Sequence, residues 1–145
     1  MIKLPVLIAS LLLTLVNLSA QCGCDSREVF VIAENPPKPN ISYEQFEEIL
    51  NHSINLSDFP SPKDNVIQIR FLVNCKGDVC NFTSLLPIDN ELKENLSQTI
   101  RSQVHWIPAR QASRIVDCWT VLTMRIEGGK FKILSEKELK KINKK

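Results

Sequence analysis

The chain has few of the residues from which catalytic and metal-binding sites are usually built. It contains two histidines, four glycines and one tyrosine among 145 residues. Its sequence carries no glycine-rich phosphate loop, no Gly-x-Ser-x-Gly nucleophile elbow and no His-Glu-x-x-His pair. His105 precedes Trp106 at a predicted helix end, where packing or capping suits it better than general-base catalysis. We therefore expect a protein that is not an enzyme, with no cofactor and no metal site.

An excess of one charge is also lacking, because 18 Lys and Arg stand against 16 Asp and Glu, a net charge of +2. Such a balance provides no electrostatic field for a polyanion, so no nucleic-acid partner is expected. Lysines gather only near the C-terminus. We interpret residues 135–145 as a basic tail that ends in a solvated helix.

No apolar run is long enough to span a bilayer comfortably, which takes about 20 residues. Residues 4–16 are mostly apolar, follow Lys3 and precede the polar break and small residue of Asn17–Ala20. This pattern predicts a secretory signal peptide over residues 1–20, with no transmembrane span after processing. A retained anchor is one alternative. Lipidation of Cys22, as in bacterial lipoproteins, is the other. The expected location is periplasmic or secreted, with a lipid-anchored envelope protein as the alternative.

Two helices are predicted. Ser42 and Gln45 have capping-box spacing, and the residues after them form an apolar stripe of Phe46, Ile49 and Leu50. Asp89 or Asn90 begins the second helix, which ends before Pro108. Its stripe recurs every four residues, at Leu92, Leu96, Ile100 and Val104. Residues 21–41 form a lead-in, with a short strand at 27–33 and a proline-stiffened connector at 35–40.

Three strands are predicted around these helices. Residues 66–73 alternate between apolar and polar side chains, the turn that follows contains Gly77, and residues 79–86 return as the second strand. Residues 114–126 form a long third strand. One of its faces carries Val116, Cys118, Leu122, Met124 and Ile126, and the other carries Trp119, Val121 and Arg125. A final short strand over 131–134 would follow the Gly128-Gly129 turn.

This order of elements predicts an α+β fold over residues 42–134. A right-handed crossover through the second helix places the third strand beside the first. The result is a two-layer sandwich: a three-stranded antiparallel sheet of order second, first, third (2-1-3), two helices on one face, and room for extra short strands at both ends.

The five cysteines are Cys22, Cys24, Cys75, Cys80 and Cys118. In an exported chain the default is disulfide formation, and their spacing fits no zinc knuckle. The strand order brings the end of the first strand beside the start of the third, which predicts a Cys75–Cys118 disulfide. A Cys75–Cys80 bond is the runner-up, and three buried free thiols are the remaining alternative.

Several short motifs together resemble the C-terminal domain of TonB. They are the 66–79 hairpin with its Lys76-Gly77 turn, the helix that ends in Trp106-Ile107-Pro108, and the lead-in from Glu28 to Pro36. The resemblance covers residues 28–133 and implies structural roles for Gly77, Trp106 and Pro108. The long proline-rich spacer of an energy transducer is missing between the signal segment and the domain.

The resemblance implies a non-enzymatic function through protein–protein contact in the cell envelope. The edge of the third strand would accept a peptide of a TonB-dependent outer-membrane receptor by β-augmentation. By resemblance this edge is Trp119, Thr120, Val121, Leu122, Thr123 and Met124. A final strand folded back on the third strand would occupy the edge. The alternative function is a disulfide-stabilised secreted or lipoprotein envelope domain with no energy-transducing role.

Overall fold

The computed structural model describes Cys22, Cys24 and residues 28–144, and the account below concerns these residues. The predicted signal peptide, residues 1–20, lies outside them. The elements in chain order are β1 (Val29–Phe30), β2 (Lys38–Pro39), α1 (Tyr43–Ser53), short 3-10 turns at Leu56–Asp58 and Lys63–Asn65, β3 (Val66–Val73), β4 (Val79–Ser84), α2 (Asn90–Gln103), β5 (Trp106–Ile107), β6 (Ala109–Gln111), β7 (Arg114–Glu127), β8 (Lys130–Ile133) and α3 (Glu136–Ile142).

The predicted α+β class and the central strand order are confirmed, since β3 lies between β4 and β7 and is antiparallel to both. The sheet is larger than the predicted three strands, for which extra short strands at both ends were allowed. Short strands β1, β6 and β8 also pair with β7, which makes a six-stranded sheet, and β2 pairs with β5 in a separate two-stranded sheet. The large sheet is mixed because β1 runs parallel to β7.

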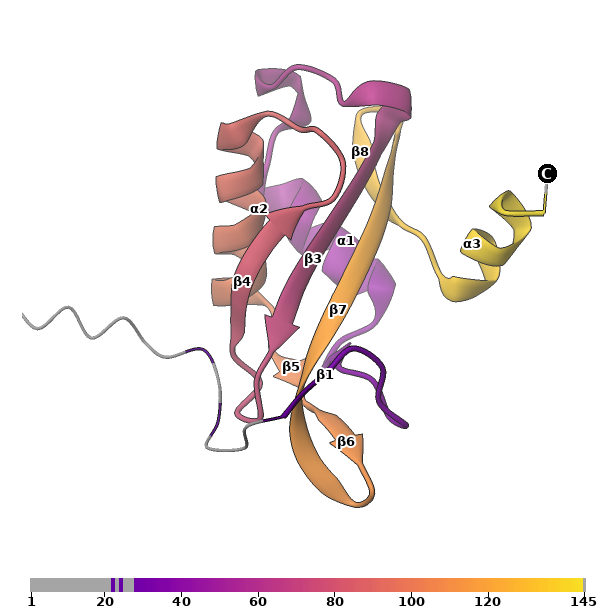
Figure 1. Cartoon of the computed structure of the whole chain (residues 1–145). Coiled ribbons are helices and arrows are strands. Elements are labelled where there is room, and N and C mark those ends of the chain that lie inside the picture. Colours follow the sequence, from indigo (N-terminus) through magenta and orange to yellow (C-terminus); the bar gives the residue numbers. More distant parts are fainter. Residues whose placement is uncertain (1–21, 23, 25–27, 145) are drawn as a thin grey trace, which may run out of the picture.

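The core lies between one face of the sheet and the helices α1 and α2 (Figure 1). Ser42 caps α1 with both hydrogen bonds of a capping box, as predicted, and Phe46 and Leu50 are its buried residues. Asp89 caps α2, which buries the predicted Leu92, Leu96 and Ile100. The strands contribute alternate residues to the same core: Ile67, Ile69, Phe71, Val73, Leu122, Met124, Phe131 and Ile133.

The hairpin between β6 and β7 was missed by the sequence analysis. Its two turn residues, Ala112 and Ser113, have φ of 49° and 65°. Positive φ at both central residues is typical of a type I′ turn, for which asparagine and glycine are the usual sequence signals. Ala-Ser gives no such signal, so the segment between Pro108 and Arg114 reads as a loop.

The three residues that the resemblance assigned to structure lie together. Gly77 has a φ of 83°, and a Cβ at this position would stand 2.4 Å from the carbonyl oxygen of Trp106 and 3.9 Å from the Pro108 Cδ. The Trp106 ring packs edge-on against Phe71 and Phe46, with centroid distances of 5.0 and 6.0 Å. The β3–β4 turn therefore sits directly on the exit of α2, and only glycine fits at this contact.

Gly77→Ala is expected to destabilise the fold by at least about 2 kcal/mol, because left-handed backbone costs about 1–2 kcal/mol and the new methyl group meets a backbone carbonyl. Gly128→Ala is the matched control. Gly128 also has a positive φ, of 57°, but a Cβ there meets nothing within 4 Å. Urea melts of both variants measure the difference. Equal losses would show that the contact with Trp106 does not matter.

Trp106→Ala is expected to cost about 3–5 kcal/mol of unfolding free energy, the usual range for truncating a large core aromatic. Ile107, the next residue, is 40% exposed, so Ile107→Ala should cost about 1 kcal/mol or less. Denaturant unfolding followed by fluorescence of Trp119 or by circular dichroism reports both values. A loss below about 1 kcal/mol for Trp106→Ala would contradict a structural role for the ring.

Candidate functional site

The edge of β7 that faces away from β3 is occupied at both ends and open in the middle. At one end β1 pairs with Asp117 and Cys118. At the other, β8 pairs with the stretch from Met124 to Glu127, and Leu134 N donates to Thr123 O at 2.9 Å. Among the described residues, no strand lies against the edge of β7 from Trp119 to Leu122.

The backbone of Val121 points toward this open stretch. The N–H and C=O groups of alternate residues of a strand point to the same edge. Thr123 O faces the β8 edge, since it accepts a hydrogen bond from Leu134 N. Val121, two residues earlier, therefore presents its N–H and C=O to the same edge, in the interval that neither β1 nor β8 reaches. These two groups have no strand partner in the described part of the chain.

A groove of about 310 Å³ follows the open stretch. The chain between β1 and α1 forms one wall, with Pro36, Pro37, Lys38, Pro39 and Tyr43. The segment that leads into α3 forms the other, with Leu134, Glu136 and Leu139, and the floor is β7 from Trp119 to Thr123 together with Trp106. In Figure 1 the purple segment after β1 and the yellow α3 lie on the same side of β7.

The outward face of β7 at the groove offers apolar and aromatic surface. The Val121 side chain is 51% exposed. The Arg70 guanidinium lies 4.0 Å from the centroid of the Trp119 ring, a cation–π contact that holds the indole in place. A segment laid along this stretch would therefore meet a backbone edge and, beside it, an ordered aromatic ring.

The outer edge of β8 is closed by side chains of α1. Asn51 Oδ1 accepts from Phe131 N at 2.8 Å, and its Nδ2 donates to Phe131 O at 3.3 Å. Glu47 Oε1 accepts from Ile133 N at 2.8 Å and lies 3.6 Å from Lys132 Nζ. Because these contacts satisfy the backbone of β8, the edge available beside it is the open stretch of β7.

The residues expected to bind a partner are thus divided. Trp119, Thr120, Val121 and Leu122 lie along the open stretch and line the groove. Met124 pairs with Ile133, and Thr123 already accepts a hydrogen bond through its carbonyl. The expectation of a binding edge that extends to Met124 is therefore wrong, because the Gly128-Gly129 turn brings β8 back onto that end of β7.

Disulfides are present as expected, but the cysteines that pair are not the predicted ones. Cys22 bonds to Cys80 and Cys24 bonds to Cys75, each with a Cα separation of 5.9 Å. The predicted Cys75–Cys118 bond is wrong, since Cys118 is free. The sulfur of Cys22, which is the atom that lipidation would modify, is held here in the disulfide with Cys80. Disulfides are typical of proteins in oxidising compartments outside the cytoplasm.

The register of β3 and β7 explains why Cys118 is free. Its partner across the strands is Val73, not Cys75. Its side chain packs in a second, smaller apolar cluster with Ala33, Ala109 and Val116, against which Phe30 is partly buried. Burial raises the pKa of the Cys118 thiol, which keeps it protonated and unreactive.

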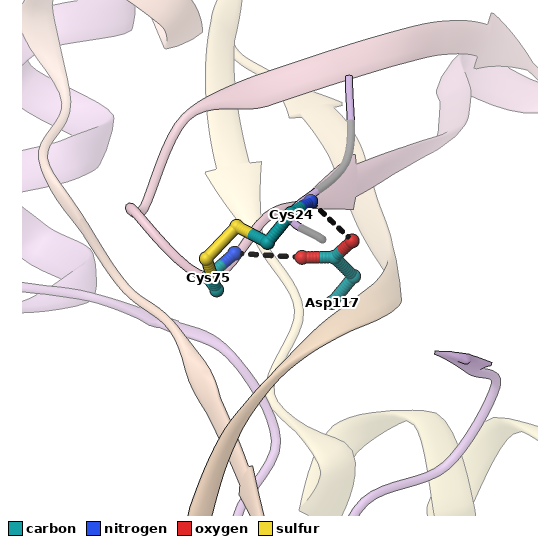
Figure 2. Close-up of side chains that lie close together, drawn as sticks. All are labelled: Cys24, Cys75 and Asp117. Atoms are coloured by element: carbon teal, nitrogen blue, oxygen red, sulfur yellow. Dashed lines mark hydrogen bonds between the residues drawn. A yellow bond between two sulfur atoms is a disulfide. The ribbon is translucent and has the colours of Figure 1, made fainter. Parts of the chain in front are cut away.

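Asp117 holds the two backbone segments that carry the second disulfide. Its carboxylate is 1% exposed and accepts hydrogen bonds from Cys75 N at 2.8 Å and from Cys24 N at 3.0 Å (Figure 2). The sequence analysis did not single it out. The available signal was a carboxylate between Val116 and Cys118, inside an apolar strand, where a buried charge requires specific partners.

One ligand atom each of Cys24, Cys75 and Asp117 lies within 4.8 Å of the others. The two sulfur atoms are bonded to each other, so they are not thiolate ligands in this state. The arrangement in Figure 2 is therefore a hydrogen-bonded cross-link between the N-terminal segment and the β3–β4 turn.

Comparison of the chain with models of protein families, with curated proteins and with solved structures finds no match. None of the helices within residues 28–144 combines the length and the apolar character required to cross a bilayer. Function is therefore inferred from the open stretch of β7 and from the cross-links beside it.

Peptide mapping without reduction is expected to recover Cys22 linked to Cys80 and Cys24 linked to Cys75. Denatured, unreduced protein should take up one equivalent of a maleimide, at Cys118, because this is the free thiol. Mass spectrometry of the labelled digest measures both results. A peptide that contains Cys118 linked to any other cysteine would contradict the pairing.

Proposed function

We propose that this protein is an exported, non-enzymatic binding domain that takes up an extended segment of a partner protein along the open stretch of β7. The observation that carries the proposal is the interval from Trp119 to Leu122, where the backbone of Val121 faces a groove and no described strand covers it. Addition of a strand to an exposed sheet edge is a recurring mode of peptide recognition.

The open stretch sets the size of the bound segment. Four residues of strand extend over about 13 Å, since each residue rises about 3.3 Å. The bound segment is therefore short, and its main-chain hydrogen bonds contribute about 0.5–1.5 kcal/mol each. Further affinity comes from contacts with Trp119 and Val121 on the outward face and from the proline wall of the groove.

The partner we propose is a periplasmic peptide of a TonB-dependent outer-membrane receptor. Support comes from the similarity of the Gly77 hairpin and the Trp106-Ile107-Pro108 helix end to the TonB C-terminal domain. Gly77 lies against Trp106 and Pro108, so the two motifs take part in one structural contact. The two disulfides agree with an oxidising location such as the periplasm.

The second candidate is a disulfide-stabilised envelope domain that binds no receptor. One observation favours it: β1 and β8 already occupy both ends of the β7 edge, which leaves a shorter acceptor than a strand-binding domain would ideally offer. The two candidates differ in a measurable property, which is whether the groove contacts an outer-membrane protein in the cell.

A photo-crosslinking amino acid such as benzoylphenylalanine at Tyr43, which lines the groove and is 44% exposed, is expected to form an adduct with an outer-membrane receptor in the native host. Val121→Pro in the same chain should lower the adduct yield about tenfold, because proline removes the N–H that faces the groove and its ring crowds the bound strand. Mass spectrometry of the adducts measures the yield and identifies the partner.

Val121→Thr is the matched control, since it keeps the N–H, the β-branched shape and the size of the side chain. Its adduct yield should stay well above that of Val121→Pro, because Val121→Thr loses one apolar contact of the side chain and keeps the main-chain hydrogen bonds. Circular dichroism melts check that Val121→Pro is folded, as expected for proline whose missing N–H faces an open edge. An adduct that Val121→Pro leaves unchanged would contradict strand addition at β7, and adducts without any receptor would favour the second candidate.

A further inference from the structure

The N-terminal segment determines where the open stretch of β7 begins. Val29 and Phe30 of β1 lie opposite Asp117 and Cys118, directly beside Trp119. If β1 were absent, the free edge would start two residues earlier. The position of β1 therefore controls the length of the edge next to the groove.

Apart from the disulfides, β1 is held by its two ladder pairs with β7 and by the contact of Phe30 with the small cluster around Cys118. The strand has two residues, and Val29, Val31 and Ile32 are 47%, 71% and 84% exposed. A two-residue strand with so little apolar burial has almost no stability of its own. The next attachments along the chain are Ala33, which is buried in the small cluster around Cys118, and the hydrogen bond from Glu34 N to Gln111 Oε1 at 2.9 Å. The bridge between Asn35 and Arg110 follows, in which each backbone N–H donates to the other carbonyl, at 3.1 and 2.9 Å.

Asp117 ties β1 to the state of the second disulfide. One oxygen of the buried carboxylate accepts from Cys75 N in the β3–β4 turn, and the other accepts from Cys24 N in the N-terminal segment. The Cys24–Cys75 bond keeps both donors in place (Figure 2). Once that bond is broken, hydration of the carboxylate competes with the Cys24 hydrogen bond, because a buried charge is costly when its partners are lost.

We propose that the Cys24–Cys75 disulfide and Asp117 form a redox-controlled strap, which holds β1 on β7 when oxidised and releases β1 when reduced. A dithiol reductant supplies the two electrons and two protons. The Cys24–Cys75 bond breaks into two thiols, and the dithiol becomes a disulfide. Release removes Phe30 from the cluster around Cys118 and extends the free edge of β7 back to Asp117.

Only the consequence for binding, a longer acceptor edge in the reduced state, rests on the proposed function. The release of β1 is a property of the domain alone. Cys118 reports it directly, because its thiol is 1% exposed in the oxidised protein and is partly covered by Phe30. A thiol uncovered by local opening becomes accessible to alkylation without global unfolding.

The test is the rate at which N-ethylmaleimide modifies Cys118 in folded protein, measured by mass spectrometry without reductant. The Cys24→Ser/Cys75→Ser variant keeps the Cys22–Cys80 bond and should react at least about tenfold faster at Cys118 than the parent chain. The Cys22→Ser/Cys80→Ser variant is the control. It loses a disulfide of similar span, 58 against 51 residues, but keeps the strap, so Cys118 should stay protected.

Equal rates in the two variants, or parental protection in the Cys24→Ser/Cys75→Ser variant, would overturn the proposal. Should that variant not fold, dithiothreitol treatment of the Cys22→Ser/Cys80→Ser variant, which holds the Cys24–Cys75 bond alone, followed by rapid desalting and maleimide labelling compares the Cys118 rates before and after reduction of that bond. Neither readout involves a partner. Fast labelling of Cys118 together with no receptor adduct from Tyr43 would therefore leave the strap standing and refute the proposed function alone.

Discussion

The structure depends on the hydrogen bonds of β7, which has more backbone groups to satisfy than its main neighbour can pair. β7 has 14 residues and β3 has 8, and β3 pairs with only one edge of β7, from Cys118 to Arg125. Unpaired backbone groups that are buried cost free energy, so the remaining parts of β7 need other partners. Three short strands supply them: β6 beside Arg114–Val116, β1 beside Asp117 and Cys118, and β8 beside the C-terminal end. The stretch left over, around Val121, is the candidate site.

The central part of this arrangement could be predicted because its signals are local and periodic. Alternation over residues 66–73 and the capping box of Ser42 and Gln45 each correspond to an observed element. The right-handed crossover then fixed which strands are neighbours. The short strands gave no comparable signal. The β6–β7 turn uses Ala112 and Ser113 at positive φ, and β1 has two residues, too few for any periodicity to be recognised.

The predicted Cys75–Cys118 disulfide is wrong for a different reason. The strand order limits the possible partners of Cys75, but it does not determine the register of the strands. In the observed register, Val73 lies opposite Cys118. The true partner of Cys75 is Cys24, and Cys80 pairs with Cys22. Both partners precede the first strand, in a segment whose path no sequence pattern specifies. The role of Asp117, the buried carboxylate that binds this segment, could not be predicted from the sequence. Its two hydrogen-bond donors lie 42 and 93 residues away in the chain.

The candidate site has a preorganised shape because the chain that forms one of its walls is stiff and attached at both ends. Proline fixes φ near −65°, so the wall formed by Pro36, Pro37 and Pro39 has few alternative conformations to lose on binding. Its two ends are anchored, by the bridge between Asn35 and Arg110 on one side and by the pairing of β2 with β5 on the other. Because β5 contains Trp106, whose carbonyl meets Gly77, this wall is joined through one short strand to the contact that locks the β3–β4 turn. Binding of a short extended segment in a groove fixed at both ends would require little ordering of the groove's own chain, which is the condition under which a few main-chain hydrogen bonds suffice for recognition.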